Sequence, residues 1–570
     1  MYDLKITNAL IVDGTGAPAY SGDLAVTNGR ITAVGSAPDE ARQVVDAQGL
    51  VLSPGFVDVH THYDAQVFWD NTVSPSCYHG VTTIFGGHCG FSIAPLSPEA
   101  APYLLNMLAR VEGMPVASLQ EGVPWDWASF DEYLKKLEGN LGVNAGFMAG
   151  HSAIRRVVMG ERAVGSEATE EEIAAMQGLL AQCLREGAMG FSSTVAITHN
   201  DADGQPVPSR HASREEMIAL ASVCKDHEGT SLEFLPAVGE FSEEIINLMI
   251  DLTTSAQRPL NWNALSAGNP RIMENQLSAS DRALAAGGDI RALTIPQPIT
   301  IRINLFTGFV FDALEGWADI FKLPIEARIE LLKDPEARRR LDASATQSGG
   351  PFRGIARWSD MKLHAAFLDK NKHLEGKTMG EIAEGTNQSP FDIMLDLAIE
   401  EGLRTFFMPK GGDTDPALWA VRAKLWRDDR TVIGASDAGA HLDMIDTFAF
   451  SSQVLGNGVR EHGVIELEEA VHQLTQVPAE LFGLKERGVL KEGWFADLVI
   501  FDPASVGSGE VHMRQDLPAD EPRIYAEAYG VRDVFVNGEQ IIDSGAHTGR
   551  LPGIALRSGR DTYTPHMRTG

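Results

Sequence analysis

The sequence predicts an α/β protein built on a (β/α)8 TIM-like barrel, with a small β-sandwich domain formed by both chain ends. A long helical insertion is expected after the seventh barrel strand. Three observations lead to this prediction. The middle of the chain alternates short apolar runs with longer amphipathic stretches, which indicates βα units and a parallel sheet. Both ends carry short strand-like runs separated by turns, and residues 298–430 fit no single βα unit.

The two ends of the chain share a texture of short apolar runs broken by turns. Strand-like runs cover residues 4–11, 23–26, 30–34 and 43–45, and then 496–501 and 531–536. Asn537-Gly538, directly after the last of these, is a strong hairpin signal. We therefore expect residues 1–53 and 481–545 to meet as two parts of one β-sandwich domain. Residues 546–570 are expected to follow as a loosely held tail.

The barrel is predicted over residues 54–480. Its eight candidate strands cover residues 55–60, 81–87, 144–151, 188–194, 230–236, 259–265, 289–297 and 431–437. Helical patterns fall between them, for example over residues 169–186. Barrel enzymes place their chemistry at the carboxyl ends of the strands, so polar residues at those ends are the first candidates for a site.

The insertion, residues 298–430, is expected to lie as a lid over the barrel mouth. It is rich in aromatic residues, among them Phe306, Phe309 and Trp317. These side chains either form the insertion's own core or line a pocket for an apolar substrate.

Composition excludes several classes of protein. The chain has 570 residues, 44% hydrophobic and 22% charged, as in an ordinary globular protein. The net charge of −31 argues against nucleic acid or an anionic membrane as a partner. Four cysteines without a Cys-x-x-Cys pair, and no apparent signal peptide or membrane-spanning run, predict a cytoplasmic protein. A homo-oligomer is possible for a chain of this size.

The most informative motif is His60-Thr61-His62, which ends the first predicted barrel strand. Side chains alternate along a strand, so His60 and His62 point to the same face. Two imidazoles on one strand face can hold one divalent metal. The alternative is a pair of ordinary polar histidines at a strand end.

Asp437 ends the eighth predicted strand, which neighbours the first strand in a closed barrel. Its carboxylate should therefore converge with the two histidines. Neutral imidazoles leave the charge of a zinc ion uncancelled, so a bound water becomes acidic. A nearby carboxylate can accept the water's proton and pass it to the leaving group. The implied reaction is hydrolysis of a carbonyl compound, most simply an amide.

Several segments resemble known families over nearly the whole chain. Residues 55–62 and 436–437, with the β-rich ends, resemble the amidohydrolase superfamily. Within it, similarity to the N-acyl-D-amino-acid deacylase family is carried by residues 88–92, 150–155, 158–160, 187–193, 478–484 and 493–499. The resemblance implies a metal-dependent hydrolase of a non-peptide carbon–nitrogen bond.

The resemblance also implies roles for the matching residues. His60 and His62 would be metal ligands, and Cys89 would be the thiolate ligand that this family uses where relatives use a carboxylated lysine. Asp437 would act as general base and then general acid. His151, at the third strand end, would line the site near the substrate, or would be a satisfied structural histidine.

This chain departs from the family at the fifth and sixth strands, which normally each end in a metal-binding histidine. The fifth strand offers Glu233, which can still bind a metal through oxygen. The sixth offers Asn261 and Asn263, of which Asn263 is taken as a substrate contact. We therefore expect one Zn²⁺, or another divalent ion, rather than two. A replacement ligand could come from histidines outside these strands: His88, His199, His211 or His441.

The substrate is less well defined by the residues. Family members hold the substrate carboxylate partly with an arginine soon after the catalytic aspartate, but here no arginine follows Asp437 until Arg460. Arg155, Arg302, Arg353 or Lys410 could take that role, and nothing in the sequence selects one of them. His441 could contact the substrate. An N-acyl-D-amino acid is thus implied by resemblance. The alternatives are a cyclic-amide or urea-type hydrolase and a non-catalytic scaffold.

Overall fold

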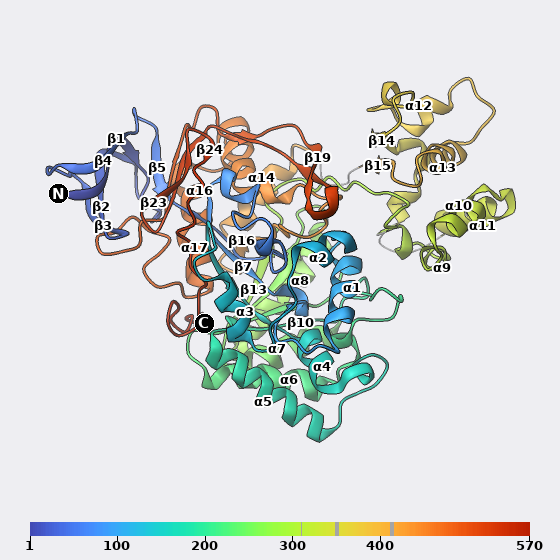
Figure 1. Ribbon diagram of the computed structural model, residues 1–570, viewed down its shortest axis with the longest axis horizontal. Helices are drawn as coiled ribbons and strands as arrows, with labels where there is room; N and C mark the ends of the chain where they lie inside the picture. The colour runs from blue at the N-terminus through green and yellow to red at the C-terminus, as the bar shows by residue number, and fades with distance from the viewer. Residues whose placement is uncertain (309, 348–352, 411–414, 570) are drawn as a thin grey trace.

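The structure is a computed structural model that describes residues 1–308, 310–347, 353–410 and 415–569; Phe309 lies outside these ranges. Figure 1 shows a β-rich unit at the N-terminal side, a central body of strands surrounded by helices, and a projecting helical lobe. Within the described ranges no helix is both long and apolar enough to cross a membrane.

Nine short parallel strands form the central body, in two sheets of order β16-β13-β12-β11-β10-β9 and β6-β7-β8. Their bounds are β6 (Phe56–Asp58), β7 (Val81–Gly86), β8 (Asn144–Phe147), β9 (Ala149–Gly150), β10 (Gly190–Thr194), β11 (Ser231–Leu235), β12 (Leu260–Leu265), β13 (Ile290–Thr294) and β16 (Thr431–Ile433). Seven of the eight predicted strands contain one of these each, and the third predicted strand contains both β8 and β9.

Backbone contacts link the two parallel sheets at both edges. The N–H of Met189 donates to the carbonyl of Phe147 at 2.8 Å, beside β8. At the other edge Thr61 and Ala438 form a parallel bridge just beyond β6 and β16. The residues that follow β6 and β16 are therefore held side by side.

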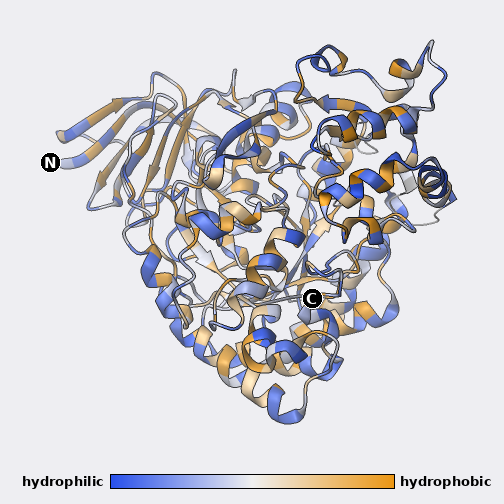
Figure 2. Ribbon diagram, turned by 45° about the vertical axis from the view of Figure 1, so that its right-hand side comes forward, coloured by the Kyte–Doolittle hydropathy of each residue, from blue (hydrophilic) through white to orange (hydrophobic). Residues whose placement is uncertain are grey.

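Helices outside the insertion lie between the parallel strands along the chain or follow the last of them. They are α1 (Ala101–Val111), α2 (Val116–Gly122), α3 (Phe130–Leu137), α4 (His151–Met159), α5 (Glu170–Glu186), α6 (Arg214–Val223), α7 (Glu243–Ala256), α8 (Pro270–Ala285), α14 (Leu418–Trp426), α15 (Phe450–Gln453), α16 (Leu467–Leu474) and α17 (Gln476–Leu481). α5 shows why such segments are helical: Thr169 and Glu172 form a capping box, and Gly187 ends the helix at φ 115°. Figure 2 shows polar residues along the outer helices and apolar residues in the strands.

Both chain ends contribute strands to one nine-stranded sheet of order β24-β23-β22-β17-β5-β1-β2-β3, with β4 beside β1. The strands are β1 (Tyr2–Ile11), β2 (Tyr20–Thr27), β3 (Arg30–Gly35), β4 (Ala41–Asp46), β5 (Val51–Pro54), β17 (Leu498–Phe501), β22 (Val531–Val536), β23 (Glu539–Asp543) and β24 (Ala546–His547). Asn537 and Gly538 turn between β22 and β23 with φ of 48° and 80°, as the hairpin signal predicts. Two short pairs accompany the sheet: β18 (Gly507–Ser508) with β21 (Ala528–Tyr529), and β19 (His512–Leu517) with β20 (Glu521–Tyr525).

The helical lobe in Figure 1 is the insertion. It contains α9 (Ala318–Phe321), α10 (Ile325–Lys333), α11 (Pro335–Gln347), α12 (Met379–Ala383), α13 (Pro390–Glu400) and the antiparallel pair β14 (Lys362–Ala365) and β15 (Phe406–Met408). Trp317 and Trp358 are buried in an apolar core of its own, against which Phe306 packs. α14 falls within residues 298–430 but packs against β13 and β16.

The C-terminal segment differs from the loosely held tail expected from its polar sequence. Leu556 is fully buried, and its N–H donates to the carbonyl of Ala145 beside β8. Arg568 donates to the Asp289 carboxylate at 2.7 Å. One apolar anchor and scattered arginines produce no periodic pattern, so this docking could not be predicted from the sequence.

Candidate active site

The ends of β6 and β16 bring His60, His62 and Asp437 together, as the strand order predicts. The Nε2 atoms of His60 and His62 lie 3.2 Å and 3.5 Å from Oδ1 of Asp437. Ser436 fixes the two strand ends to each other, because its hydroxyl donates to the Asp58 carboxylate at 2.7 Å. Asp437 itself has φ 52°, a left-handed conformation that a non-glycine residue adopts at some cost.

Cys89 lies in a tight turn after β7, close to His60 and to Glu233 of β11. Its Sγ is 3.7 Å from His60 Nε2, and its N–H donates to Glu233 Oε2 at 2.7 Å. The turn depends on Gly87, which has φ 76°; a Cβ there would lie 2.3 Å from the carbonyl oxygen of Met148. Cys89 also has a positive φ, 55°. The backbone is thus bent to aim the thiol at the histidines.

Two overlapping groups of buried donors could hold a metal ion. One is His60, His62 and Cys89, and the other is His60, His88 and Glu233; within each group the donor atoms lie within 4.8 Å of one another. The ring of His88 stacks on that of His60 with centroids 4.3 Å apart. His88 is therefore a stronger candidate than its sequence context indicated.

Glu112 is a buried site residue that sequence reasoning missed. It caps the end of α1, and its Oε1 lies 3.4 Å from Nδ1 of His62, on the side of the ring away from Asp437. The residue follows a helix in an irregular connection, so no strand pattern marks it. Its carboxylate is placed to orient the His62 ring.

Asn263 contacts Asp437 and His441 follows it in the same loop, whereas Asn261 bonds to the neighbouring strand β11. Asn263 Nδ2 donates to Asp437 Oδ1 at 3.1 Å, and Asn261 Nδ2 donates to the carbonyl of Leu232 at 3.1 Å. The N–H of His441 donates to the carbonyl of Glu112 at 2.5 Å, which ties the loop after Asp437 to the end of α1.

His151 and Arg155 lie together, and both side chains contact Glu216 of α6. His151 Nδ1 lies 2.8 Å from Ser193 Oγ, and its Nε2 lies 2.9 Å from Glu216 Oε1. Arg155 forms an ion pair with the other oxygen of Glu216, and all three side chains are fully buried. Their role in substrate binding stays a prediction, and these contacts favour a supporting one.

Burial and charge act against each other in this site. Burial raises the pKa of Glu233 to about 8 and that of Glu112 to about 7. Burial alone would lower the pKa of His62, but Glu112 and Asp437 outweigh it and raise the pKa to about 9. Burial also opposes ionisation of Asp437, yet its two histidine contacts hold its pKa well below the ordinary value. The site thus gathers carboxyl groups around imidazoles in a buried setting.

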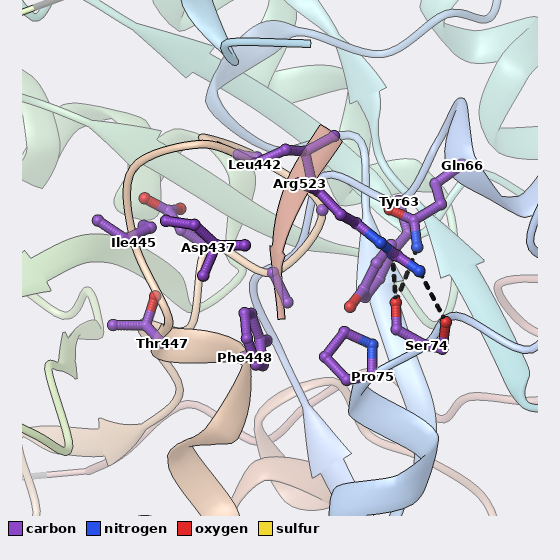
Figure 3. A pocket seen from close by; sticks show the side chains of 14 residues that line it. Tyr63, Gln66, Ser74, Pro75, Asp437, Leu442, Ile445, Thr447, Phe448 and Arg523 are labelled. Atoms are coloured by element: carbon purple, nitrogen blue, oxygen red, sulfur yellow. Dashed lines mark hydrogen bonds between the residues drawn. The ribbon is translucent and has the colours of Figure 1, made fainter. Parts of the chain in front are cut away.

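A small cavity lies beside the Asp437 loop, between Asp437 and Arg523 (Figure 3). Arg523 donates to the carbonyl and the hydroxyl oxygen of Ser74 at 2.8 Å and 3.0 Å and pairs with Asp516. Its donors are therefore engaged within the protein, although a cation at this place would otherwise suit a substrate carboxylate.

Two histidines, a thiol and carboxylates at the carboxyl ends of parallel strands define the class of metal-dependent hydrolases. The chain belongs to the amidohydrolase family, whose family model matches residues 43–542. It is 28% identical over 561 residues to a D-aminoacylase of Alcaligenes xylosoxydans xylosoxydans, with 97% of each chain covered. It is 27% identical over 564 residues to an N-acyl-D-aspartate deacylase of the same organism, covering 98% of this chain and 95% of that one.

A solved structure of a D-aminoacylase, studied for its binuclear metal centre, matches with a TM-score of 0.65 and 25% identity. It covers 98% of this chain and 100% of the other. The resemblance seen in the sequence is therefore confirmed, and the chain is a metal-dependent hydrolase of carbon–nitrogen amide bonds. Neither the cyclic-amide or urea-type reaction nor a non-catalytic scaffold is favoured by these relatives.

Proposed function

We propose that this protein hydrolyses the amide bond of an N-acyl-D-amino acid at a site built from His60, His62, Cys89, Glu233 and Asp437. The observation that carries the proposal is the convergence of these donors from four separate strands or the residues that follow them. Similarity to a D-aminoacylase and to an N-acyl-D-aspartate deacylase along nearly their whole lengths supports the choice of substrate.

We extend the proposal to the architecture that holds the site. The two parallel sheets, joined beside Phe147 and at Thr61–Ala438, would close as one eight-stranded barrel over residues 54–480. Residues 1–53 and 481–545 would form the β domain and 298–430 the lid.

The donor set fits a divalent ion of the size and preference of zinc. Tetrahedral zinc–nitrogen and zinc–oxygen bonds separate two such donors by about 3.3 Å, and a sulfur and a nitrogen by about 3.6 Å. The observed separations are 3.2 Å for His60 Nε2 to Asp437 Oδ1 and 3.7 Å for His60 Nε2 to Cys89 Sγ. Because both candidate groups share His60, one ion is the simpler proposal.

The protein's own residues define the remaining chemistry. When bound, a divalent ion would acidify a water molecule and polarise the amide carbonyl. Asp437 accepts the proton of the attacking water and delivers it to the amide nitrogen as the carbon–nitrogen bond breaks, giving a carboxylic acid and a free amine. Asn263 holds the Asp437 carboxylate in place through its hydrogen bond. His441, on the same loop, is proposed to contact the substrate.

The test is metal content together with hydrolysis, on protein purified without chelator or an affinity tag. We expect about one divalent ion per chain at the His60–Asp437 site and release of free amine from an N-acyl-D-amino acid, with much slower reaction of the L-enantiomer. Two ions per chain would instead indicate that both donor groups are filled. A protein that binds no metal after reconstitution, or that hydrolyses only hydantoins, would refute the proposal.

Replacing Glu112 by glutamine should weaken metal binding by about 10- to 100-fold, because carboxylates that orient metal-binding histidines contribute on that scale. The dissociation constant can be measured by competition with a chromophoric chelator. The matched control is Glu121→Gln, an exposed residue of the neighbouring helix α2, which should leave it unchanged. Equal affinity in Glu112→Gln and the unaltered protein would show that His62 is oriented without Glu112.

A further inference from the structure

A cavity of about 330 Å³ lies between the α1–α2 connection, the insertion and β20. This is within the range of pockets that bind small organic molecules. Most of its wall is apolar, including Met114, Val116, Phe306, Phe367, Phe406 and Pro522. The insertion's own apolar core is a separate cluster that does not include Phe367. Of these wall residues only Phe306 packs against that core, so the cavity presents apolar surface beyond it.

The cavity adjoins the proposed metal site through two wall residues. Gly113 directly follows Glu112, whose carboxylate contacts His62. Asp443 is two residues beyond His441, the residue whose N–H donates to the Glu112 carbonyl. Consecutive Cα atoms are about 3.8 Å apart. The wall of the cavity also touches the loop after Asp437 in space, because a Cβ on Gly113 would lie 3.4 Å from the Cα of His441.

The wall carries one cation and two carboxylates. The Arg404 guanidinium lies over the ring of Phe306, 4.4 Å from its centroid. Among the described residues its side chain has no carboxylate partner and no hydrogen-bond acceptor. Asp443 is already engaged, since its Oδ2 accepts from Asn304 Nδ2 at 2.8 Å, and Glu521 is the second acid. One oriented guanidinium in an apolar wall matches a ligand with one carboxylate on an apolar body.

We propose that this cavity binds the amino-acid half of the substrate, with its α-carboxylate on Arg404 and an apolar side chain against Phe367 and Phe406. The inference rests on the proposed function and supplies the cation that does not follow Asp437 in the sequence. A second carboxylate on the side chain would face Asp443 and Glu521, so acidic amino acids are disfavoured. The substrate class is an N-acyl amino acid with a neutral, apolar side chain.

The test compares Arg404→Gln with the unaltered enzyme on N-acetyl-D-leucine and on its neutral carboxamide. We expect the variant to lose about 10- to 100-fold in kcat/KM on the carboxylate substrate, mainly through KM, because a charge-assisted hydrogen bond is lost. The carboxamide, which offers no anion, should lose less than about threefold. N-acetyl-D-aspartate should be a poorer substrate than N-acetyl-D-leucine for the unaltered enzyme, by about tenfold or more.

The matched control is Arg339→Gln, an exposed arginine of α11 in the same insertion that does not line the cavity. It should change neither substrate's kinetics. Unchanged kinetics of Arg404→Gln on N-acetyl-D-leucine, or a preference for N-acetyl-D-aspartate, would overturn the subsite while leaving the proposed hydrolysis intact. An unaltered, metal-loaded enzyme that hydrolyses no N-acyl-amino acid would overturn both.

Discussion

Asp437→Asn should keep the fold and the bound metal but lower kcat by about 10² to 10⁴-fold, the usual contribution of a general base. The carboxylate lies within 3.2 Å and 3.5 Å of the two histidines and is held by Asn263. Asparagine has nearly the same size and can still contact both imidazoles through its oxygen. It cannot accept a proton at neutral pH. Steady-state hydrolysis of an N-acyl-D-amino acid and metal content per chain would measure the two properties separately.

The control for this variant is Asp429→Asn, at the other end of β16, where the side chain is 83% exposed. It should leave turnover unchanged. Near-normal turnover in Asp437→Asn would exclude Asp437 as the base and shift attention to Glu233. Loss of metal along with activity would show that Asp437 matters chiefly as a ligand.

Much of the site could be predicted because regular strands restrict where their ends lie. Four of the predicted residues follow a strand that the alternation of apolar runs reveals, and Glu233 lies within one; the four are His60, His62, Cys89 and Asp437. Parallel neighbours bring such ends to one edge, and the side-chain period of two selects which residues face inward. The sequence therefore predicted a cluster before any contact was known.

Residues from irregular connections could not be predicted in this way. Glu112 reaches His62 from the end of a helix, and Arg404 lines its cavity from a loop just before β15. Neither position carries a periodic signal. Each residue also acts beside segments that are far from it in the chain. To predict where these two side chains lie, one must know how α1, the insertion and the loop after Asp437 are placed relative to one another. That placement depends on packing.

Arg155 illustrates a different limit of the sequence. Its place after the third strand suggested a substrate contact, yet it pairs with Glu216 of α6, 61 residues away. An arginine is equally suited to a ligand and to a buried carboxylate, so residue type could not decide between them. The partner became evident only when α4 and α6 were placed next to the strand ends.

Glu216→Gln should destabilise the protein by about 3 to 5 kcal/mol, the cost of removing one partner of a buried ion pair. Arg155 would keep its hydrogen bond to the Ser166 carbonyl, at 2.7 Å, but would be left as a buried charge without a counter-charge. Chemical denaturation at neutral pH would give the difference in free energy of unfolding. Glu215→Gln, the adjacent exposed position on α6, is the control and should change that free energy by less than about 0.5 kcal/mol.

The effect of pH provides an independent check on the same ion pair. Burial alone would raise the pKa of Glu216, but His151 and Arg155 outweigh it and lower the pKa. A carboxylate whose pKa is lowered by folding stabilises the protein fully above its unfolded pKa of about 4.3, and this contribution is lost as the pH falls through the folded value. The difference between Glu216→Gln and the unaltered protein should therefore be constant near neutral pH and shrink only in acid. A difference that persists unchanged in acid, or one below about 1 kcal/mol at pH 7, would contradict a charged pair and indicate that packing alone holds α4 to α6.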